Sequence, residues 1–383
     1  MTVRSCSSRP VFRGLAVAVL LAGCVSEDGN GAYFPAPGPA WERRTPEEVG
    51  MDPDLVSQAV EYAKAHDSEV VPYDYSGHEE KFGPLEGPLP EERGGPAGLI
   101  LRHGYIVAEW GDTERADLTF SVTKSFVSTM TGLAYDRGLI ESTKDPIARY
   151  VTDGKFDSEH NAKITWEILL QQTSEWEGTL FGKSDTADFY HRRGRELPRQ
   201  EPGTYYEYND VRVNLASYAT LMVWRRSLAE LMKELVMDPI GASDSWTWHG
   251  YRTSNVEIDG RTINSVAGGG HWGGGLWIGA RDMARFGYLF LRGGQWDGEQ
   301  LISPEWIQLA TTPSQRRGDY GYMWWLTPDE NAEPGTPATT YAARGYGSNI
   351  IWIDTVLDLV VVLRWFGGRA PKFFDPLIQS VGK

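Results

Sequence analysis

The sequence predicts an α+β fold in which both chain ends form an antiparallel sheet, flanked by helices and with an inserted helical subdomain. Two apolar runs with the pattern of β-hairpins lie far apart, at 99–108 and at 350–363. The stretch between them is rich in apolar residues at helical spacing. Strands at both ends with helices between them favour this architecture. A chain of 383 residues that is 41% hydrophobic is also long enough to bury a sizeable core.

Local signals place the individual elements. Asp52 and Pro53 are typical of a helix start, and the Pro-, Gly- and Glu-rich run 73–96 is expected to be a loop. One hairpin turns at a His-Gly pair within 99–108, and the other turns around 354–357. Further helices are expected at 120–137, 166–172, 211–224, 281–291 and 304–311. We therefore place one domain over 46–383, with the helical subdomain inserted at about 138–245.

The first 23 residues have the pattern of an export signal. Three arginines precede a short apolar run, 14–21, which is too short to span a bilayer. The run ends in Leu-Ala-Gly-Cys, which resembles a bacterial lipobox and implies that Cys24 is lipidated and becomes the first residue. A plain signal peptide is the alternative. Residues 24–45 are expected to be a flexible tether, so we expect an exported lipoprotein, anchored to a bacterial membrane and facing the periplasm or the cell exterior.

Charge, cysteine content and motif searches exclude several classes of protein. The net charge is −15, and removing the three arginines of residues 1–23 leaves −18. Such an acidic body is a poor nucleic-acid binder, and membrane contact is expected only through the lipid. Cys6 lies in the removed segment, so no internal disulfide is expected. The histidines lack metal-ligand spacing, and neither a phosphate loop nor a Gly-x-Ser-x-Gly elbow occurs, so no metal or cofactor is predicted.

Ser121 and Lys124 lie three residues apart at the start of the predicted helix at 120–137. Residues at this spacing share a helix face, so the hydroxyl and the amine can approach hydrogen-bonding distance. A serine hydroxyl needs a base to become a nucleophile, and a lysine serves only if its pKa is depressed. The helix N-terminus would add backbone N–H groups for an oxyanion. The same pattern also fits a serine N-cap followed by a solvated lysine.

A second motif strengthens the first. Residues 201–210 contain a Pro-Gly turn and an aromatic run with Tyr208, and they end at Asp210. The order and spacing resemble the serine β-lactamase and penicillin-binding-protein superfamily. The resemblance is closest to the class C-like branch, with family VIII carboxylesterases and 6-aminohexanoate-oligomer hydrolases. It implies a β-lactamase/transpeptidase-like fold, Ser121 as nucleophile, and Lys124 and Tyr208 as proton-transfer groups. Further landmarks of the family occur at 145–147, 164–174, 273–275, 282–287 and 320–325.

The sequence departs from the family pattern at two places. Asp210 stands where the family usually has Asn, and a carboxylate there would favour the charged form of Lys124. The family's Lys-Thr-Gly or His-x-Gly motif falls on 343–345, where the first-position cation is missing. Gly345 still allows close backbone approach, but Arg344 is displaced by one residue and is expected on the opposite strand face. By the resemblance, the backbone N–H groups of Tyr346 and Ser121 form the oxyanion hole.

Two aromatic positions complete the predicted substrate contacts. Trp176 follows a family landmark and is expected beside the site, although ordinary packing is the alternative. His271 lies in a run of glycines and either lines a cleft or belongs to a strand entry with unusual backbone angles. Together with these two, the expected substrate-binding residues are Asp210, Arg344, Gly345 and Tyr346.

These residues predict a serine hydrolase that cleaves an ester or amide bond of a small molecule or peptide through an acyl-enzyme on Ser121. Both Lys124 and Tyr208 are candidates for the general base. A β-lactamase or a D-alanyl-D-alanine carboxypeptidase is the first alternative, and the missing cation counts against it. The second alternative is a non-catalytic, lipid-anchored protein that binds cell-wall peptide. A pure binder would need none of the three residues chemically. The fold alone does not name the substrate.

Overall fold

The computed structural model describes residues 32–70, 90–186, 198–269, 275–331 and 335–382. The chain divides into two units, Met1–Ala32 and Tyr33–Lys383, and the fold belongs to the second. The predicted export signal and Cys24 lie outside the described residues, as does most of the loop expected at 73–96. None of the helices in the described part of the chain combines the length and the apolar character that a membrane crossing requires.

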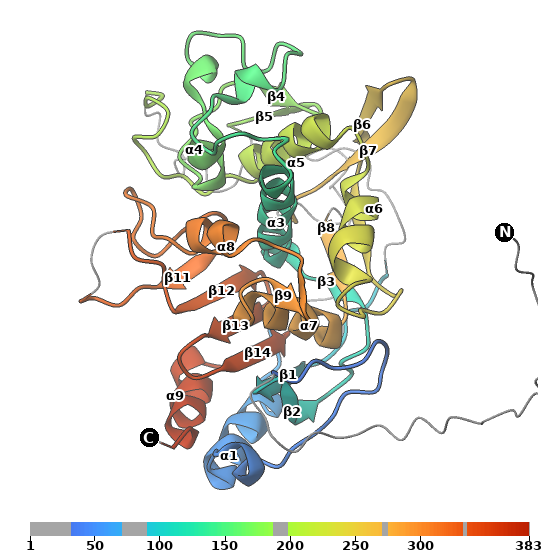
Figure 1. Cartoon of the computed structure of the whole chain (residues 1–383), viewed down its shortest axis with the longest axis vertical. Helices are drawn as coiled ribbons and strands as arrows, with labels where there is room; N and C mark the ends of the chain where they lie inside the picture. Colours follow the sequence, from blue (N-terminus) through green and yellow to red (C-terminus); the bar gives the residue numbers. More distant parts are fainter. Residues whose placement is uncertain (1–31, 71–89, 187–197, 270–274, 332–334, 383) are drawn as a thin grey trace, which may run out of the picture. The chain divides into compact units, whose positions relative to one another are not determined.

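The larger sheet is built from both ends of the chain, as the sequence predicts (Figure 1). Its strand order is β11-β12-β13-β14-β1-β2, and neighbouring strands are antiparallel. The two ends join where Ala97 pairs with Arg364. The strands are β1 (Ala97–Arg102), β2 (Tyr105–Trp110), β11 (Trp325–Thr327), β12 (Thr340–Gly345), β13 (Asn349–Asp354) and β14 (Leu359–Arg364).

Different helices cover the two faces of this sheet. Helices α1 (Pro53–Lys64) and α9 (Ala370–Ser380) pack on one face, and α7 (Ala280–Leu291) packs on the other. Side chains of β14 alternate between these two cores, with Val361 in the first and Val362 in the second. Because both faces are buried, the strand sequence is continuously apolar rather than alternating.

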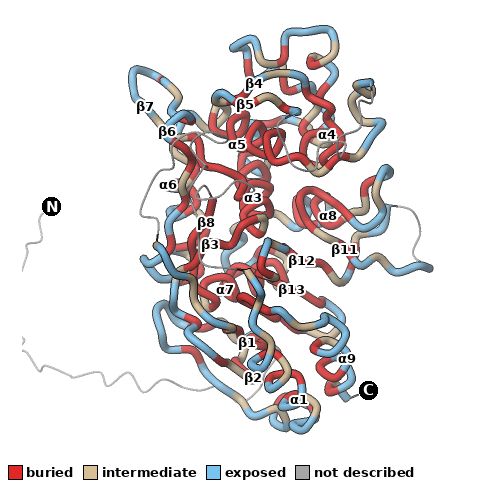
Figure 2. Tube along the Cα trace, turned by 180° about the vertical axis from the view of Figure 1, so that it is seen from behind, coloured by how far each residue is buried: buried red, intermediate tan, exposed pale blue. Residues whose placement is uncertain are grey.

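The segment between β2 and β11 contains the five helices expected at 120–311. α3 begins three residues later than expected because a 3₁₀ turn precedes it, and the other bounds agree to within two residues. Figure 2 shows α3 and α5 buried along most of their length. The helices are α3 (Thr123–Asp136), preceded by the 3₁₀ turn η2 (Phe120–Val122), α4 (Trp166–Leu170), α5 (Asp210–Trp224), α6 (Leu228–Met232), the π-helical η6 (Lys233–Met237), α7 and α8 (Pro304–Ala310). Single turns occur at η1 (Glu47–Val49), η3 (Ile147–Arg149) and η4 (Asn161–Lys163).

A second antiparallel sheet, with the order β3-β8-β6-β7, was not expected from the sequence. Its strands β3 and β8 are short, and the pairing of β6 with β7 shifts register between Gly250 and Asn255, so no regular alternation marks them. The strands are β3 (Asp117–Leu118), β6 (Thr247–Ile258), β7 (Arg261–Val266) and β8 (Gly275–Ile278). Two small hairpins are formed by β4 (Thr179–Leu180) with β5 (Lys183–Ser184), and by β9 (Gln295–Trp296) with β10 (Glu299–Gln300).

Residues 33–44, which fall in the expected flexible tether, are instead bound to the body, and we call them the strap. The buried guanidinium of Arg285 donates to the carbonyl oxygens of Ala36 (2.7 Å) and Gly38 (2.9 Å). The Trp41 indole donates to the carbonyl of Gly104 at 2.7 Å. The tether prediction therefore fails for this part, because side chains distant in sequence supply its binding partners.

Candidate active site

Ser121 lies in η2, the turn that connects β3 with α3. Strand β8 holds this turn: the Thr119 backbone N–H donates to the Leu276 carbonyl at 2.9 Å, and the Leu276 N–H donates to Thr123 Oγ1 at 3.1 Å. Phe120 has a φ of 51°, a left-handed conformation that residues with a side chain seldom adopt. Contacts with the second sheet therefore fix Ser121, rather than helix propensity alone.

The structure brings Ser121 and Lys124 together. Lys124 Nζ lies 2.8 Å from Ser121 Oγ and 2.7 Å from Asp210 Oδ1. The side chain of Lys124 is 2% exposed and that of Asp210 is 9% exposed. Lys124 is thus a buried group paired with a carboxylate, and not the solvated lysine of the alternative interpretation.

Tyr208 lies beside the same amine. Lys124 Nζ is 4.9 Å from the centroid of the Tyr208 ring, a distance at which a cation is attracted to the ring face. The other neighbours of the ring are Trp325, stacked at 5.8 Å, and Tyr320, edge-on at 6.3 Å. Burial raises the pKa of Tyr320 well above its ordinary value. Both residues lie in the landmark run 320–325, to which the sequence analysis gave no role at the site.

The start of α5 positions Tyr208. Asn209 is the N-cap of this helix, and its side chain accepts from the Arg212 backbone N–H at 3.1 Å. The same side chain donates to the Asp185 carbonyl at 2.7 Å, and its backbone N–H donates to Gln172 Oε1 at 3.2 Å. The residue that follows Tyr208 is therefore fixed by three hydrogen bonds to three different segments.

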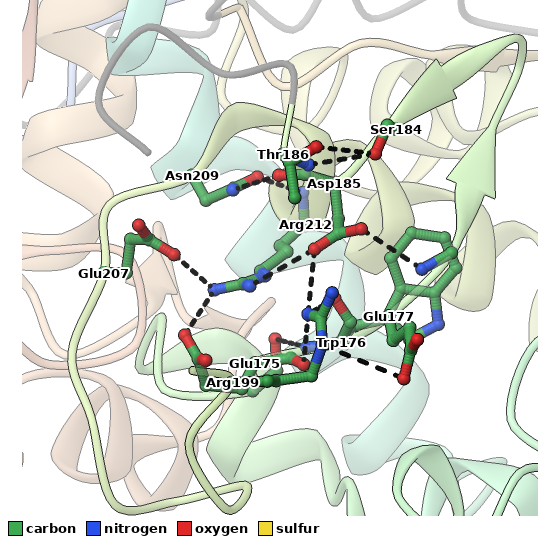
Figure 3. A network of polar contacts seen from close by, with 12 residues as sticks. Glu175, Trp176, Glu177, Ser184, Asp185, Thr186, Arg199, Glu207, Asn209 and Arg212 are labelled. Atoms are coloured by element: carbon green, nitrogen blue, oxygen red, sulfur yellow. Dashed lines mark hydrogen bonds and ion pairs between the residues drawn. The ribbon is translucent and has the colours of Figure 1, made fainter. Parts of the chain in front are cut away.

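A buried network of charges, which we call the Arg212 clamp, surrounds this helix start (Figure 3). Arg212 Nη1 lies 2.9 Å from Glu207 Oε2 and 3.2 Å from Glu175 Oε1, and Arg212 Nη2 lies 3.6 Å from Asp185 Oδ2. Arg199 Nη1 approaches the same Asp185 oxygen at 2.9 Å. Arg212 and Glu175 are fully buried. The sequence alone does not single out these residues, because each charge considered by itself resembles a solvated surface group.

Strand β12 ends directly against the Ser121 turn. A Cβ on Gly345 would lie 2.0 Å from the Thr119 carbonyl oxygen and 3.1 Å from the Ser121 backbone nitrogen, so only glycine fits there. Tyr346 follows and is 56% exposed, with its ring edge-on to Phe120 at 5.4 Å. The structure therefore places both expected oxyanion-hole residues at one junction.

The other predicted substrate-binding residues are Arg344, Trp176 and His271. Arg344 is exposed; its charge lowers the pKa of Asp319, although the hydrogen bond from Arg317 is the larger cause. Trp176 is 1% exposed, and its indole donates to the Lys155 carbonyl at 2.9 Å, so it occupies a packed position in the core. His271 lies outside the described residues.

The assembled groups are a serine hydroxyl, a buried amine paired with a carboxylate, and a phenol ring against that amine. Such an arrangement suits nucleophilic attack with proton transfer. No group of His, Cys, Asp and Glu side chains that could hold a metal ion occurs among the residues that the structure describes. The fold and the site define a protein of the β-lactamase/transpeptidase-like superfamily.

Comparisons with known proteins give the family. The Beta-lactamase family model matches residues 102–367, and the chain belongs to this family. It is 22% identical over 300 residues to the 6-aminohexanoate-dimer hydrolase of Paenarthrobacter ureafaciens, covering 71% of this chain and 72% of that protein.

Solved structures show the same fold at low identity. The chain is similar to a putative β-lactamase from Bacteroides dorei, with a TM-score of 0.59 at 16% identity, over 75% of this chain and 93% of the other. It is also similar to a family VIII carboxylesterase, with a TM-score of 0.55 at 17% identity, over 87% and 98% of the two chains. The resemblance inferred from the motifs is confirmed.

Proposed function

We propose that this protein is a serine hydrolase that cleaves an ester or amide bond through an acyl-enzyme on Ser121. The observation that carries the proposal is the 2.8 Å contact between Ser121 Oγ and the buried Lys124 Nζ. A serine hydroxyl becomes a useful nucleophile when a base lies within hydrogen-bonding reach. The names of the relatives, a 6-aminohexanoate-dimer hydrolase and a carboxylesterase, agree with amide or ester substrates.

The reaction has two steps. In acylation, Ser121 Oγ attacks the carbonyl carbon and its proton passes to the amine of Lys124, while the backbone N–H groups of Ser121 and Tyr346 stabilise the oxyanion. The leaving group then departs with a proton. In deacylation, Tyr208, assisted by Lys124, activates a water molecule that releases the acyl group.

The substrate class is an ester or amide rather than a penicillin-type carboxylate. Ala343 occupies the position where penicillin-recognising relatives carry a cation, and the charge of the neighbouring Arg344 acts on Asp319. We further propose that the reaction takes place outside the cytoplasm, with the protein held by a lipid on Cys24. The acidic body agrees with a protein that binds neither nucleic acid nor anionic lipid.

The test is covalent labelling of the active serine. The full chain is incubated with a fluorophosphonate probe and, separately, with a labelled penicillin, and adducts are located by peptide mass spectrometry. We expect a fluorophosphonate adduct on Ser121 that is absent from Ser121→Ala and present in Ser125→Ala, whose hydroxyl donates to the Met323 carbonyl instead. An adduct that survives Ser121→Ala, or no adduct with either reagent, would contradict the proposal. Efficient penicillin labelling would favour the β-lactamase alternative.

A further inference from the structure

We infer that the Asp210 carboxylate, ionised before the reaction starts, accepts a proton during acylation, and that Lys124 relays the Ser121 proton to it. The inference rests on the proposed function, because it assigns one step of that reaction. In this assignment Asp210 acts on Ser121 through Lys124, so it is a positioning residue that sets the charge of the amine.

The Lys124 amine lies between the Ser121 hydroxyl and the Asp210 carboxylate. Lys124 Nζ donates a hydrogen bond to Ser121 Oγ at 2.8 Å and forms an ion pair with Asp210 Oδ1 at 2.7 Å. Both distances are short enough for a proton to move between the groups after a small adjustment of the amine. Because Lys124 is 2% exposed and Asp210 is 9% exposed, protein groups rather than bulk water must receive the proton. The Tyr208 ring, whose centroid is 4.9 Å from Nζ, stabilises a cation there.

The surroundings of Asp210 favour neutral groups. Among the residues that the structure describes, the ionisable side chains recorded near it are Lys124 of α3, the preceding Tyr208, Tyr251 of β6 and Tyr320 of the segment before β11. Burial raises the pKa of Tyr251 and of Tyr320 well above the ordinary value, and the charge of Asp210 adds to both effects. Lys183 lies behind Tyr251, with Nζ 5.7 Å from its ring centroid. The Lys124–Asp210 pair thus has a net charge of zero in a buried site.

A carboxylate at this position changes what the lysine can do. If residue 210 were an amide, Lys124 would have to lose its proton to solvent before it could act as a base. With Asp210, moving one proton from Nζ to Oδ1 yields a neutral amine beside Ser121 and leaves the net charge of the pair unchanged. A low-dielectric site disfavours a separated charge more than a neutral pair. The carboxylate therefore does not confine Lys124 to its charged form.

The step balances as follows. Ser121 Oγ forms a bond to the substrate carbonyl carbon while its proton moves to Lys124 Nζ and an Nζ proton moves to Asp210 Oδ1. The carbonyl electron pair moves onto the oxyanion. When the bond to the leaving group breaks, the leaving group takes a proton from Lys124, which recovers one from Asp210. The pair ends in its starting state, and no other reactant is needed.

The relay predicts the pH range in which the rate of acylation falls on acidification, which we call the acid limb of the pH profile. Acylation requires an ionised carboxyl group in the wild type, so activity falls on acidification through the range of a carboxyl pKa, ordinarily about 4. In Asp210→Asn, acylation requires a neutral amine at Lys124, and the ordinary pKa of a lysine is about 10. The acid limb should therefore move up by at least about 2 pH units. Asp210→Glu keeps a carboxylate and should keep the low-pH limb.

The experiment measures the rate of fluorophosphonate adduct formation on Ser121 from pH 4 to 10, by intact mass. The full chain is compared with Asp210→Asn, Asp210→Glu and Asp282→Asn. The last variant makes the same change in a buried carboxyl group that binds Ser243, and its profile should match the wild type. We expect an upward shift only in Asp210→Asn, with a plateau at high pH within about 10-fold of the wild type.

Two results would overturn the relay. One is an Asp210→Asn profile whose acid limb coincides with that of the wild type, whatever its plateau. The other is a wild-type limb that already lies in the range of a lysine. If Asp210→Asn does not fold, as judged by circular dichroism, Tyr208→Phe replaces it: the relay predicts an unmoved acid limb, and an upward shift contradicts it. A wild-type protein without any Ser121 adduct would refute the proposed function instead, so the two failures are distinguishable.

Discussion

A buried lysine amine is unfavourable unless its charge is paired and its hydrogen bonds are made. Lys124 meets both conditions within one cluster, through Asp210 on one side and Ser121 on the other, with the Tyr208 ring facing Nζ. In the proposed mechanism, Lys124 and Asp210 take up the Ser121 proton in acylation, and the Tyr208 hydroxyl activates water in deacylation.

Replacing Tyr208 by Phe separates the two steps. The hydroxyl is lost, while the ring that stacks on Trp325 and faces Lys124 remains. We expect the burst of product from a chromogenic p-nitrophenyl ester to persist, whereas steady-state turnover falls by about 10²–10⁴-fold, as is typical for loss of a general acid or base. Stopped-flow absorbance measures both phases.

Tyr206→Phe is the matched control, because its ring lies against Arg317 and Tyr320 and burial raises the pKa of its hydroxyl. Both phases should match those of the wild type in this variant. A Tyr208→Phe variant that turns over normally would remove Tyr208 from the mechanism. One that loses the burst as well would make Tyr208 the base of acylation.

At the scale of elements, the start of α5 determines where the side chains of Tyr208 and Asp210 lie in the site. Tyr208 and Asp210 flank the N-cap Asn209, so the helix start places both side chains against Lys124 of α3. The Arg212 clamp holds that start to the segments around Glu175 and Asp185. A shift of these segments would move the phenol and the carboxylate together.

Removing the central guanidinium of the clamp should be costly. Arg212→Met leaves Glu175 and Glu207 buried without their cation, which is expected to destabilise the fold by about 3–5 kcal/mol. Urea unfolding followed by tryptophan fluorescence measures the loss. Arg225→Met is the control, because its ion pair with Asp259 is exposed and should contribute nothing measurable. Equal stability of the two variants would show that the clamp is not a determinant of the fold.

The sequence predicts those elements whose signals are local. The helix at 120–137 and the hairpin at 350–363 have periodic apolar patterns and turn residues of their own, and both are found. The contact between Ser121 and Lys124 could be predicted from the sequence, because residues three apart lie on the same face of a helix. The Arg212 clamp could not be predicted in this way. Arg212 is 37 residues from its partner Glu175, and the charged groups meet only when separate segments converge on the start of α5.

At the scale of the whole molecule, the same limit applies to the strap. Its Pro- and Gly-rich composition is typical of a flexible tether, yet it is bound by groups far along the chain. Arg285 of α7 donates to two of its carbonyls, and the Tyr288 hydroxyl donates to the Tyr33 carbonyl at 2.6 Å. Tyr33 also stacks on Tyr105 with ring centroids 4.3 Å apart. The composition of the strap reflects only its own residues, whereas its conformation depends on contacts with α7 and β2. The composition alone therefore could not predict that it is bound.

The strap should therefore contribute to the stability of the whole fold. A hydrogen bond to a charged group is worth about 1.5–3 kcal/mol, so loss of the two that Arg285 donates to the carbonyls of Ala36 and Gly38 should cost about 3–6 kcal/mol. A chain that begins at Thr45 should melt roughly 5–10 °C below the full chain, whereas one that begins at Tyr33 should match it. Differential scanning calorimetry of the three chains measures their melting temperatures. Identical melting temperatures for all three would mean that the strap is bound too weakly to matter, and that a tether could extend as far as Thr45.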